Sequence, residues 1–333
     1  MATFRASQVV PSPAEDSERL RKAFVGLGTN ERAIISILAH RNAAQRRRIR
    51  ETYQETYGED LFKSLDKEIS GDFERAVLLW TMDPAERDAL LANEAATKWY
   101  PGNRVLVEIA CTRSAGELLS AKKAYQARYK RSLEEVVAAH IKGDFRKDIS
   151  RSKLHISLVP MVVLLLFPLV SCHRYEGPEV NVALAKSEAK ILHEAISDKV
   201  YNHEEIIRIL GTRSKAQLVV TFNQYNDEFG NPINKDLKHD PKDEFLATLR
   251  AIVRCIFCPE RYFEKVVRLA IEGLGTDENA LTRIIATRAE VDLQLIKEIY
   301  AKRNSKQLDQ AISNDASGDY EAFLLELLGH EEN

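Results

Sequence analysis

The apolar residues of this chain recur mostly at intervals of three and four, the spacing that places side chains on one face of an α-helix. Two such stripes consist of Ala33, Ile34, Ile37 and Leu38, and of Leu281, Ile284 and Ile285. No convincing run of alternating apolar and polar residues indicates β-strands. The pattern therefore predicts an all-α fold of many short helices, each of which buries one face.

Four segments of the chain share a column of marker residues, which indicates an internal repeat. Each segment contains an arginine followed twelve residues later by a tyrosine. The arginines are Arg41, Arg113, Arg213 and Arg288, and the tyrosines are Tyr53, Tyr125, Tyr225 and Tyr300. We therefore expect four helical repeats that pack on one another as a curved array.

The first and last repeats contain near-identical glycine loops. Residues 26–31 read Gly-Leu-Gly-Thr-Asn-Glu, and residues 273–278 read Gly-Leu-Gly-Thr-Asp-Glu. Two glycines around one residue let the backbone adopt positive φ, so that successive carbonyl oxygens can converge. Thr29 and Thr276 are expected to be helix N-caps, which places each loop between two helices. After 38 further residues each threonine is followed by a carboxylate, Glu68 or Asp315.

Converging carbonyl oxygens and a distal carboxylate suit a hard cation. Ca²⁺ accepts six to eight oxygen ligands in loose geometry, whereas Mg²⁺ demands a tighter octahedron, so the loops favour calcium. An ordinary helix–loop–helix turn is the alternative for a single copy. Two copies with the same spacing favour a binding role.

Four repeats with Gly-x-Gly-Thr, a 38-residue gap and an acidic residue resemble the annexin family, and the degenerate middle repeats are similar to those of plant annexins. The resemblance covers nearly the whole chain. It implies a curved disc of four repeats of about five helices each, with calcium loops on the convex face that bridge to phospholipid headgroups. The implied boundaries are a tail at 1–14, repeats at 15–87 and 88–170, a linker with the third repeat at 171–258, and a repeat at 259–333.

The resemblance also implies the ligands of each calcium site, namely three loop carbonyl oxygens and one distal carboxylate. The first site would use Phe24, Gly26, Gly28 and Glu68, and the fourth would use Ile271, Gly273, Gly275 and Asp315. Leu27 and Leu274 lie between the glycines, and we expect them to contact the membrane rather than the core. Burial of one such side chain contributes roughly 1.5–3 kcal/mol, so the ion must supply much of the remaining attraction.

The two middle repeats depart from this pattern. Residues 98–103 read Lys-Trp-Tyr-Pro-Gly-Asn, and His140 stands in the acidic column, so the second site is expected to be lost. Asp240 keeps the acidic column of the third repeat, but residues 197–201 contain no glycine. We expect that site to be absent or very weak, which leaves two calcium sites.

Composition is consistent with this division of roles. The chain has 48 basic and 50 acidic residues and a formal net charge of −2, so no large cationic field attracts it to anionic phospholipid. Basic runs are short and flanked by acids, which argues against nucleic acid as a partner. Residues 1–13 lack the apolar core of a signal peptide, and the four cysteines are too few for a disulfide scaffold. A cytoplasmic protein that binds membranes peripherally when calcium rises is therefore expected.

One segment interrupts the repeat pattern. The arginine columns are 72, 100 and 75 residues apart, and the long middle interval contains an apparent insertion at 148–167. The apolar run 156–170 is about 15 residues long with two prolines, below the roughly 20 residues that span a bilayer. An altered final helix of the second repeat and an exposed extension produced by alternative splicing are the other interpretations. We expect that 148–167 can be deleted without loss of calcium-dependent lipid binding.

Several weaker patterns supply alternative functions. His40 replaces a threonine of the repeat column, and the family resemblance suggests a peroxidase centred on it; the family also suggests a calcium-permeable membrane conductance. Cys111 and Cys255 match cysteines that are redox-responsive in plant annexins. The segment Ile207, Arg208 and Ile209 resembles a proposed contact with F-actin.

No phosphate-binding loop and no hydrolase motif occurs in the sequence. The main interpretation is therefore a calcium-dependent phospholipid-binding protein that is not an enzyme. We expect a monomer in solution, with oligomers as an open question on the lipid surface.

Overall fold

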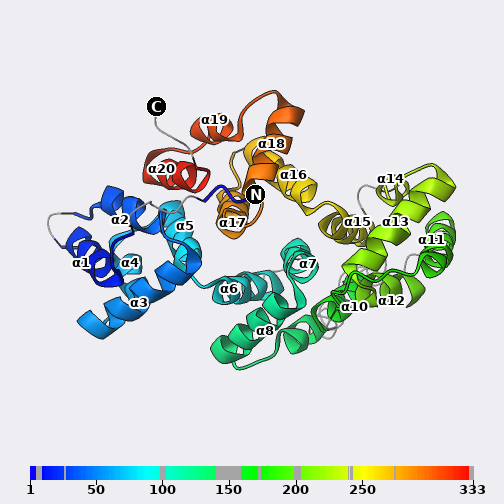
Figure 1. Cartoon of the computed structure of the whole chain (residues 1–333), viewed down its shortest axis with the longest axis horizontal. Coiled ribbons are helices and arrows are strands. Elements are labelled where there is room, and N and C mark those ends of the chain that lie inside the picture. The colour runs from blue at the N-terminus through cyan, green and yellow to red at the C-terminus, as the bar shows by residue number, and fades with distance from the viewer. Residues whose placement is uncertain are drawn as a thin grey trace, which may run out of the picture. The chain divides into compact units, whose positions relative to one another are not determined.

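The computed structural model describes residues 1–4, 10–25, 28–97, 103–139, 159–171, 174–198, 204–238, 240, 243–273 and 275–329. Every regular element in these ranges is a helix, which confirms the all-α prediction. The chain forms two compact units. One consists of Met1–Pro84 with Glu260–Asn333, and the other of Ala85–Pro259 (Figure 1).

The first unit joins the two ends of the chain. Its N-terminal helices are α1 (Pro13–Ala23), α2 (Glu31–Leu38), α3 (Ala43–Tyr57), α4 (Leu61–Glu68) and α5 (Gly71–Thr81). Its C-terminal helices are α16 (Pro259–Ile271), α17 (Glu278–Arg288), α18 (Leu293–Asn304), α19 (Leu308–Ser313) and α20 (Gly318–Leu327). Helix α5 packs against α17 and α20, and α2 also packs against α20 (Figure 1). The first and fourth repeats therefore share one core.

The second unit contains the middle repeats. Its helices are α6 (Pro84–Thr97), α7 (Asn103–Thr112), α8 (Ala115–Tyr129), α10 (Val159–Ser171), α11 (Val182–Ser197), α12 (Glu204–Thr212), α13 (Lys215–Phe229), α14 (Ile233–Asp236) and α15 (Glu244–Phe257), and residues 133–139 are also helical. The second and third repeats are joined where α7 packs against α15. Each unit is thus built from a pair of repeats.

An arginine–carboxylate pair with a buried carboxylate recurs in three of the repeats, always between residues 25 positions apart. In the first repeat, Arg41 donates from Nε and Nη2 to the two carboxylate oxygens of Asp16, at 2.6 and 2.8 Å. The side chains of this pair are only 2% and 1% exposed. The equivalent pairs are Arg113 with Asp88 and Arg213 with Glu188. Each pair ties the first helix of its repeat to the end of the second helix, because loss of one partner would leave an unpaired buried charge.

The fourth repeat makes the same connection with different chemistry. Phe263 on α16 occupies the position of the acid, and the Arg288 guanidinium lies 4.5 Å from the centre of its ring. Arg288 bonds instead to Asp292, with Nε at 2.7 Å from Oδ1. A cation–π contact and a local ion pair therefore replace the buried pair of the other repeats.

Helix α10 begins in the segment that the sequence marks as an insertion and continues to Ser171. Six apolar side chains of α10 are buried: Val162, Val163, Leu165, Leu166, Leu169 and Val170. The helix packs against α7 and α12, and a Cβ atom on Gly211 of α12 would lie only 3.0 Å from the Pro168 Cβ. Helix α10 therefore belongs to the core of the second unit, between α7 and α12.

This packing argues against the expectation that the whole of 148–167 is removable. Four of the buried side chains, from Val162 to Leu166, belong to that segment, so its deletion would open the core of the second unit. Residues 148–158 lie outside the described part of the chain. No helix among the described residues is long and apolar enough to cross a membrane.

Two neighbouring leucines of α10 test this assignment. Leu166 is 1% exposed and Leu164 is 47% exposed. We expect Leu166→Ala to lower the free energy of unfolding by about 2–5 kcal/mol, because truncation of a buried leucine leaves a cavity. Leu164→Ala is the matched control and is expected to have little effect. Urea unfolding followed by circular dichroism measures both, and an unaffected Leu166→Ala protein would show that α10 is not part of the core.

Candidate functional site

The glycine loop of the fourth repeat connects α16 to α17. It closes where the backbone N–H of Asp277 donates to the Ala270 carbonyl at 2.8 Å. Gly275 has φ of +91°, in the left-handed region that favours glycine. A Cβ atom on Gly273 would lie 3.0 Å from the Gly275 carbonyl oxygen and 3.6 Å from that of Leu269. Main-chain oxygens thus converge on the space that a side chain at Gly273 would fill.

The loop of the first repeat connects α1 to α2 in the same way. The backbone N–H of Asn30 donates to the Ala23 carbonyl at 2.9 Å, which matches the closure of the fourth loop. Gly28 has φ of +99°, close to the value at Gly275. Gly26 and Leu27 lie outside the described residues, as does Leu274 in the fourth loop. The described parts of the two loops therefore agree in closure and backbone conformation.

The distal carboxylates return to these loops. Glu68 is the last residue of α4, and Asp315 lies two residues after the end of α19. The Thr29 hydroxyl lies 2.9 Å from Oε2 of Glu68, and the Thr276 hydroxyl donates to Oδ2 of Asp315 at 2.6 Å. Each carboxylate is therefore next to the glycine loop from which 38 intervening residues separate it in the sequence.

The expectation that the threonines are N-caps is wrong. The N-cap of α2 is Asn30, whose side chain accepts from the Ala33 N–H, and the N-cap of α17 is Asp277, whose side chain accepts from the Ala280 N–H. Asparagine and aspartate are at least as good as threonine at this position. The threonine hydroxyl is thereby released to bond the distal carboxylate. The sequence pattern did not reveal this contact, although the constant spacing of threonine and acid is the signal that could have done so.

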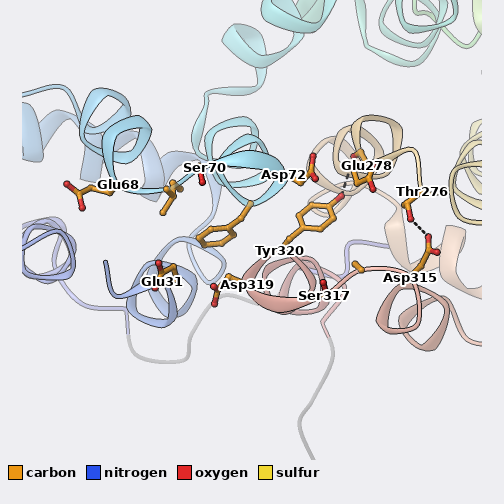
Figure 2. A pocket seen from close by; sticks show the side chains of 13 residues that line it. Glu31, Glu68, Ser70, Asp72, Thr276, Glu278, Asp315, Ser317, Asp319 and Tyr320 are labelled. Atoms are coloured by element: carbon orange, nitrogen blue, oxygen red, sulfur yellow. Dashed lines mark hydrogen bonds between the residues drawn. The ribbon is translucent and has the colours of Figure 1, made fainter. Parts of the chain in front are cut away.

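Glu68 and Asp315 also line a pocket of about 420 Å³ within the first unit (Figure 2). Six carboxylates line this pocket: Glu31, Glu68, Asp72, Glu278, Asp315 and Asp319. They come from matching positions of the first and fourth repeats, and its described lining residues include no lysine, arginine or histidine. The surface between the two loops is therefore strongly negative and attracts cations.

Two aromatic rings border the acidic pocket. Phe73 and Tyr320 are each 8% exposed. The Tyr320 hydroxyl lies 2.8 Å from the Thr282 hydroxyl, and burial raises the pKa of Tyr320 above its ordinary value. The tyrosine therefore stays neutral at physiological pH and adds no further negative charge to the pocket.

The other residues singled out by the sequence lie elsewhere. His40 Nε2 is 3.3 Å from Oε2 of Glu326 on α20. Cys111 and Cys255 are buried, and burial raises the pKa of the Cys111 thiol to about 11, which favours the protonated thiol at physiological pH. Arg208 bonds to Glu205 with Nη2 at 2.6 Å from Oε2. None of these contacts joins the glycine loops.

In the middle repeats, most residues of the loops that correspond to the glycine loops are not described by the structure. Residues 98–102, His140 and residues 199–203 lie outside the described part of the chain, so the structure adds nothing to the expectations about them. Asp240 is described, but the loop that would face it is not. No group of three or more histidine, cysteine, aspartate or glutamate side chains in the described ranges could hold a metal ion. In the first and fourth repeats, one carboxylate lies beside each glycine loop.

Four helical repeats, with a glycine loop and a returning carboxylate in the first and last, define an all-helical repeat protein. The Annexin family model matches residues 15–80, 87–149, 187–252 and 262–327, and this chain belongs to the annexin family. Annexin Gh1 of Gossypium hirsutum is 61% identical over 332 residues and covers 100% of each chain. Annexin D2 of Arabidopsis thaliana is 57% identical over 331 residues, with 99% of each chain covered.

Solved annexin structures have the same fold. Annexin III superposes with a TM-score of 0.85 at 32% identity, covering 99% of this chain and 98% of that one. A structure described as calcium-bound annexin (Sm)1 gives a TM-score of 0.81 at 27% identity, covering 100% of this chain and 94% of that one. These comparisons confirm the predicted family and its four-repeat helical architecture.

The loop geometry generates a stability prediction. Gly275→Ala is expected to lower the free energy of unfolding by about 1–2 kcal/mol, because an L-residue is strained at positive φ. Gly116 in α8 is the matched control, since it has no positive φ and a Cβ there meets nothing within 4 Å. Gly116→Ala should stabilise the protein by about 0.5–1 kcal/mol. Urea unfolding distinguishes the two, and a Gly275→Ala protein as stable as wild type would contradict the described loop conformation.

Proposed function

We propose that this protein binds anionic phospholipid membranes in a calcium-dependent manner through two sites, one in the first repeat and one in the fourth. The observation that carries the proposal is the recurrence of one arrangement, in which a glycine loop with positive φ is hydrogen-bonded through a threonine to a distant carboxylate. The proposed ligands are the carbonyl oxygens of Phe24, Gly26 and Gly28 with Glu68, and those of Ile271, Gly273 and Gly275 with Asp315.

The residues of the fourth loop fit a hard cation. The carbonyl oxygen of Gly275, one of the proposed ligands, lies 3.0 Å from the position of a Cβ on Gly273, and Asp315 adds a negative charge close to the same loop. Oxygen ligands of this mixed kind suit calcium better than magnesium. When bound, Ca²⁺ would supply positive charge that attracts lipid phosphate. The related annexin (Sm)1 has been solved in a calcium-bound form, which supports the choice of ion.

Electrostatics explains why binding should depend on calcium. The net charge of the protein is −2, and the pocket between the two loops is lined by six carboxylates, so an anionic membrane is repelled in the absence of cations. Leu27 and Leu274 at the loop tips would add apolar contact with the headgroup region. We therefore propose a reversible, peripheral association of a cytoplasmic monomer, with no covalent step.

The carboxylates provide the direct test. We expect Glu68→Gln and Asp315→Asn each to raise the calcium concentration for half-maximal vesicle binding about tenfold, because the affinity of oxygen-ligand sites depends on ligand charge. The double variant should lose nearly all binding. Co-sedimentation with phosphatidylserine vesicles over a range of calcium concentrations measures the effect.

Asp240→Asn is the matched control, because Asp240 occupies the same column of a repeat without a glycine loop. It should leave the calcium dependence unchanged. Normal calcium-dependent binding by the double variant would rule out the two-site proposal, and a large loss in Asp240→Asn would indicate a third site.

A further inference from the structure

The threonine of each glycine loop makes a specific contact that capping does not explain. Thr276 Oγ1 donates to Oδ2 of Asp315 at 2.6 Å (Figure 2). Thr29 Oγ1 lies 2.9 Å from Oε2 of Glu68 and 3.0 Å from the backbone carbonyl oxygen of the same residue. The adjacent residues Asn30 and Asp277 provide the helix caps. Both hydroxyl groups thus reach the distal carboxylate rather than the N-terminus of the following helix, and the Thr29 hydroxyl also reaches the last carbonyl of α4.

This contact restricts a side chain that is otherwise free to rotate. Asp315 is exposed to solvent. Within the described part of the chain, its carboxylate is held by the hydrogen bond from Thr276. An unrestrained carboxylate loses conformational freedom when it binds an ion, and this entropy cost weakens binding. Threonine is well suited to prevent that loss, because its branched Cβ keeps the hydroxyl in few rotamers.

The hydroxyl also leaves the carboxylate able to bind a cation. In each site it contacts only one of the two carboxylate oxygens, Oε2 of Glu68 or Oδ2 of Asp315. A carboxylate has about four acceptor positions, so one hydrogen bond leaves the second oxygen and a further lone pair available.

We propose that Thr29 and Thr276 are positioning residues, which hold the distal carboxylate toward the glycine loop before the cation arrives. This inference rests on the proposed calcium-binding function. It adds to each site a residue that does not itself need to touch the ion. The threonines determine how much calcium is required, whereas the carbonyls and carboxylates determine whether it binds.

The sequences of the middle repeats agree with this role. Pro101 stands in the threonine column of the second repeat, where His140 replaces the acid, so both partners of the contact are absent together. In the third repeat Asp240 remains, but Tyr201 stands in the threonine column. Threonine and acid occur together only in the two repeats that keep the glycines.

The two contacts differ in a way that predicts unequal effects. The Thr276 bond of 2.6 Å lies in the range of a charge-assisted O–H···O⁻ bond, and Asp315 Oδ2 is its acceptor. The single proton of Thr29 is shared between a carboxylate oxygen and a backbone oxygen of Glu68, and both distances are longer. Loss of the hydroxyl should therefore affect the fourth site more than the first.

Isolated sites are needed to test this prediction. Glu68→Gln leaves only the fourth site intact, and Asp315→Asn leaves only the first. Thr276→Val in the Glu68→Gln background, and Thr29→Val in the Asp315→Asn background, then remove one hydroxyl with little change in shape. The measurement is the calcium concentration for half-maximal binding to phosphatidylserine vesicles, with thermal unfolding in the presence of a chelator as the measure of stability.

We expect Thr276→Val to raise the required calcium concentration about 3- to 10-fold, the change that corresponds to loss of one hydrogen bond to a charged group at an exposed site. The shift for Thr29→Val should be smaller. Thr276→Ser should restore the calcium dependence to within about twofold, because serine keeps the hydroxyl. Ser36→Ala is the matched control, since the exposed Ser36 hydroxyl bonds only to the Ala33 carbonyl in its own helix.

The possible contradictions are distinct. If Thr276→Val binds at the same calcium concentration as its background, or at a lower one, the hydroxyl does not position the carboxylate for the ion. If Thr276→Ser fails to restore binding and both variants melt lower, the contact is only structural. If the wild-type protein shows no calcium-dependent binding, the proposed function itself fails.

Discussion

The structure depends on the contact between an arginine and the first helix of each repeat. Arg41 and Asp16 show its most complete form, with two hydrogen bonds and almost no solvent exposure. This contact fixes the two helices that flank a loop, whatever the loop contains. The middle repeats keep the pair although their glycine loops are lost, and the fourth repeat keeps the connection through Phe263. The contact therefore serves the fold, and the loops it supports are free to gain or lose a cation site.

The first unit brings both intact loops into one body. Because α5 packs against α17 and α20, the ends of the chain share a core, and the carboxylates of the two repeats line one acidic pocket. This arrangement concentrates negative charge between the two candidate sites. In the proposed function, a cation is needed before an anionic surface can approach, and the positioned carboxylates lower the entropy cost of binding it. Charge and preorganisation would together make membrane binding depend on calcium.

Much of this could be predicted from the sequence. The sequence directly shows features that depend on local conformation and on repeat length. These are the glycine pairs, the arginine column and the fixed spacing to Glu68 and Asp315. Contacts that depend on how the helices pack could not be predicted from the sequence. Asn30 and Asp277 are the N-caps because asparagine and aspartate cap a helix better than threonine does. The apolar segment before Pro168 is part of a core helix because α7 and α12 provide a surface against which it packs. The acidic pocket requires two repeats to meet, which no local pattern reveals.

We propose that two repeats, and not four, bind calcium at the membrane. The most direct measurement is the number of calcium ions bound per protein molecule on phosphatidylserine vesicles, determined by equilibrium dialysis with radioactive calcium. We expect the wild-type protein to bind two ions tightly. The double variant with Glu68→Gln and Asp315→Asn should retain none at the same calcium concentrations. Four tightly bound ions, or two that persist without those carboxylates, would contradict it.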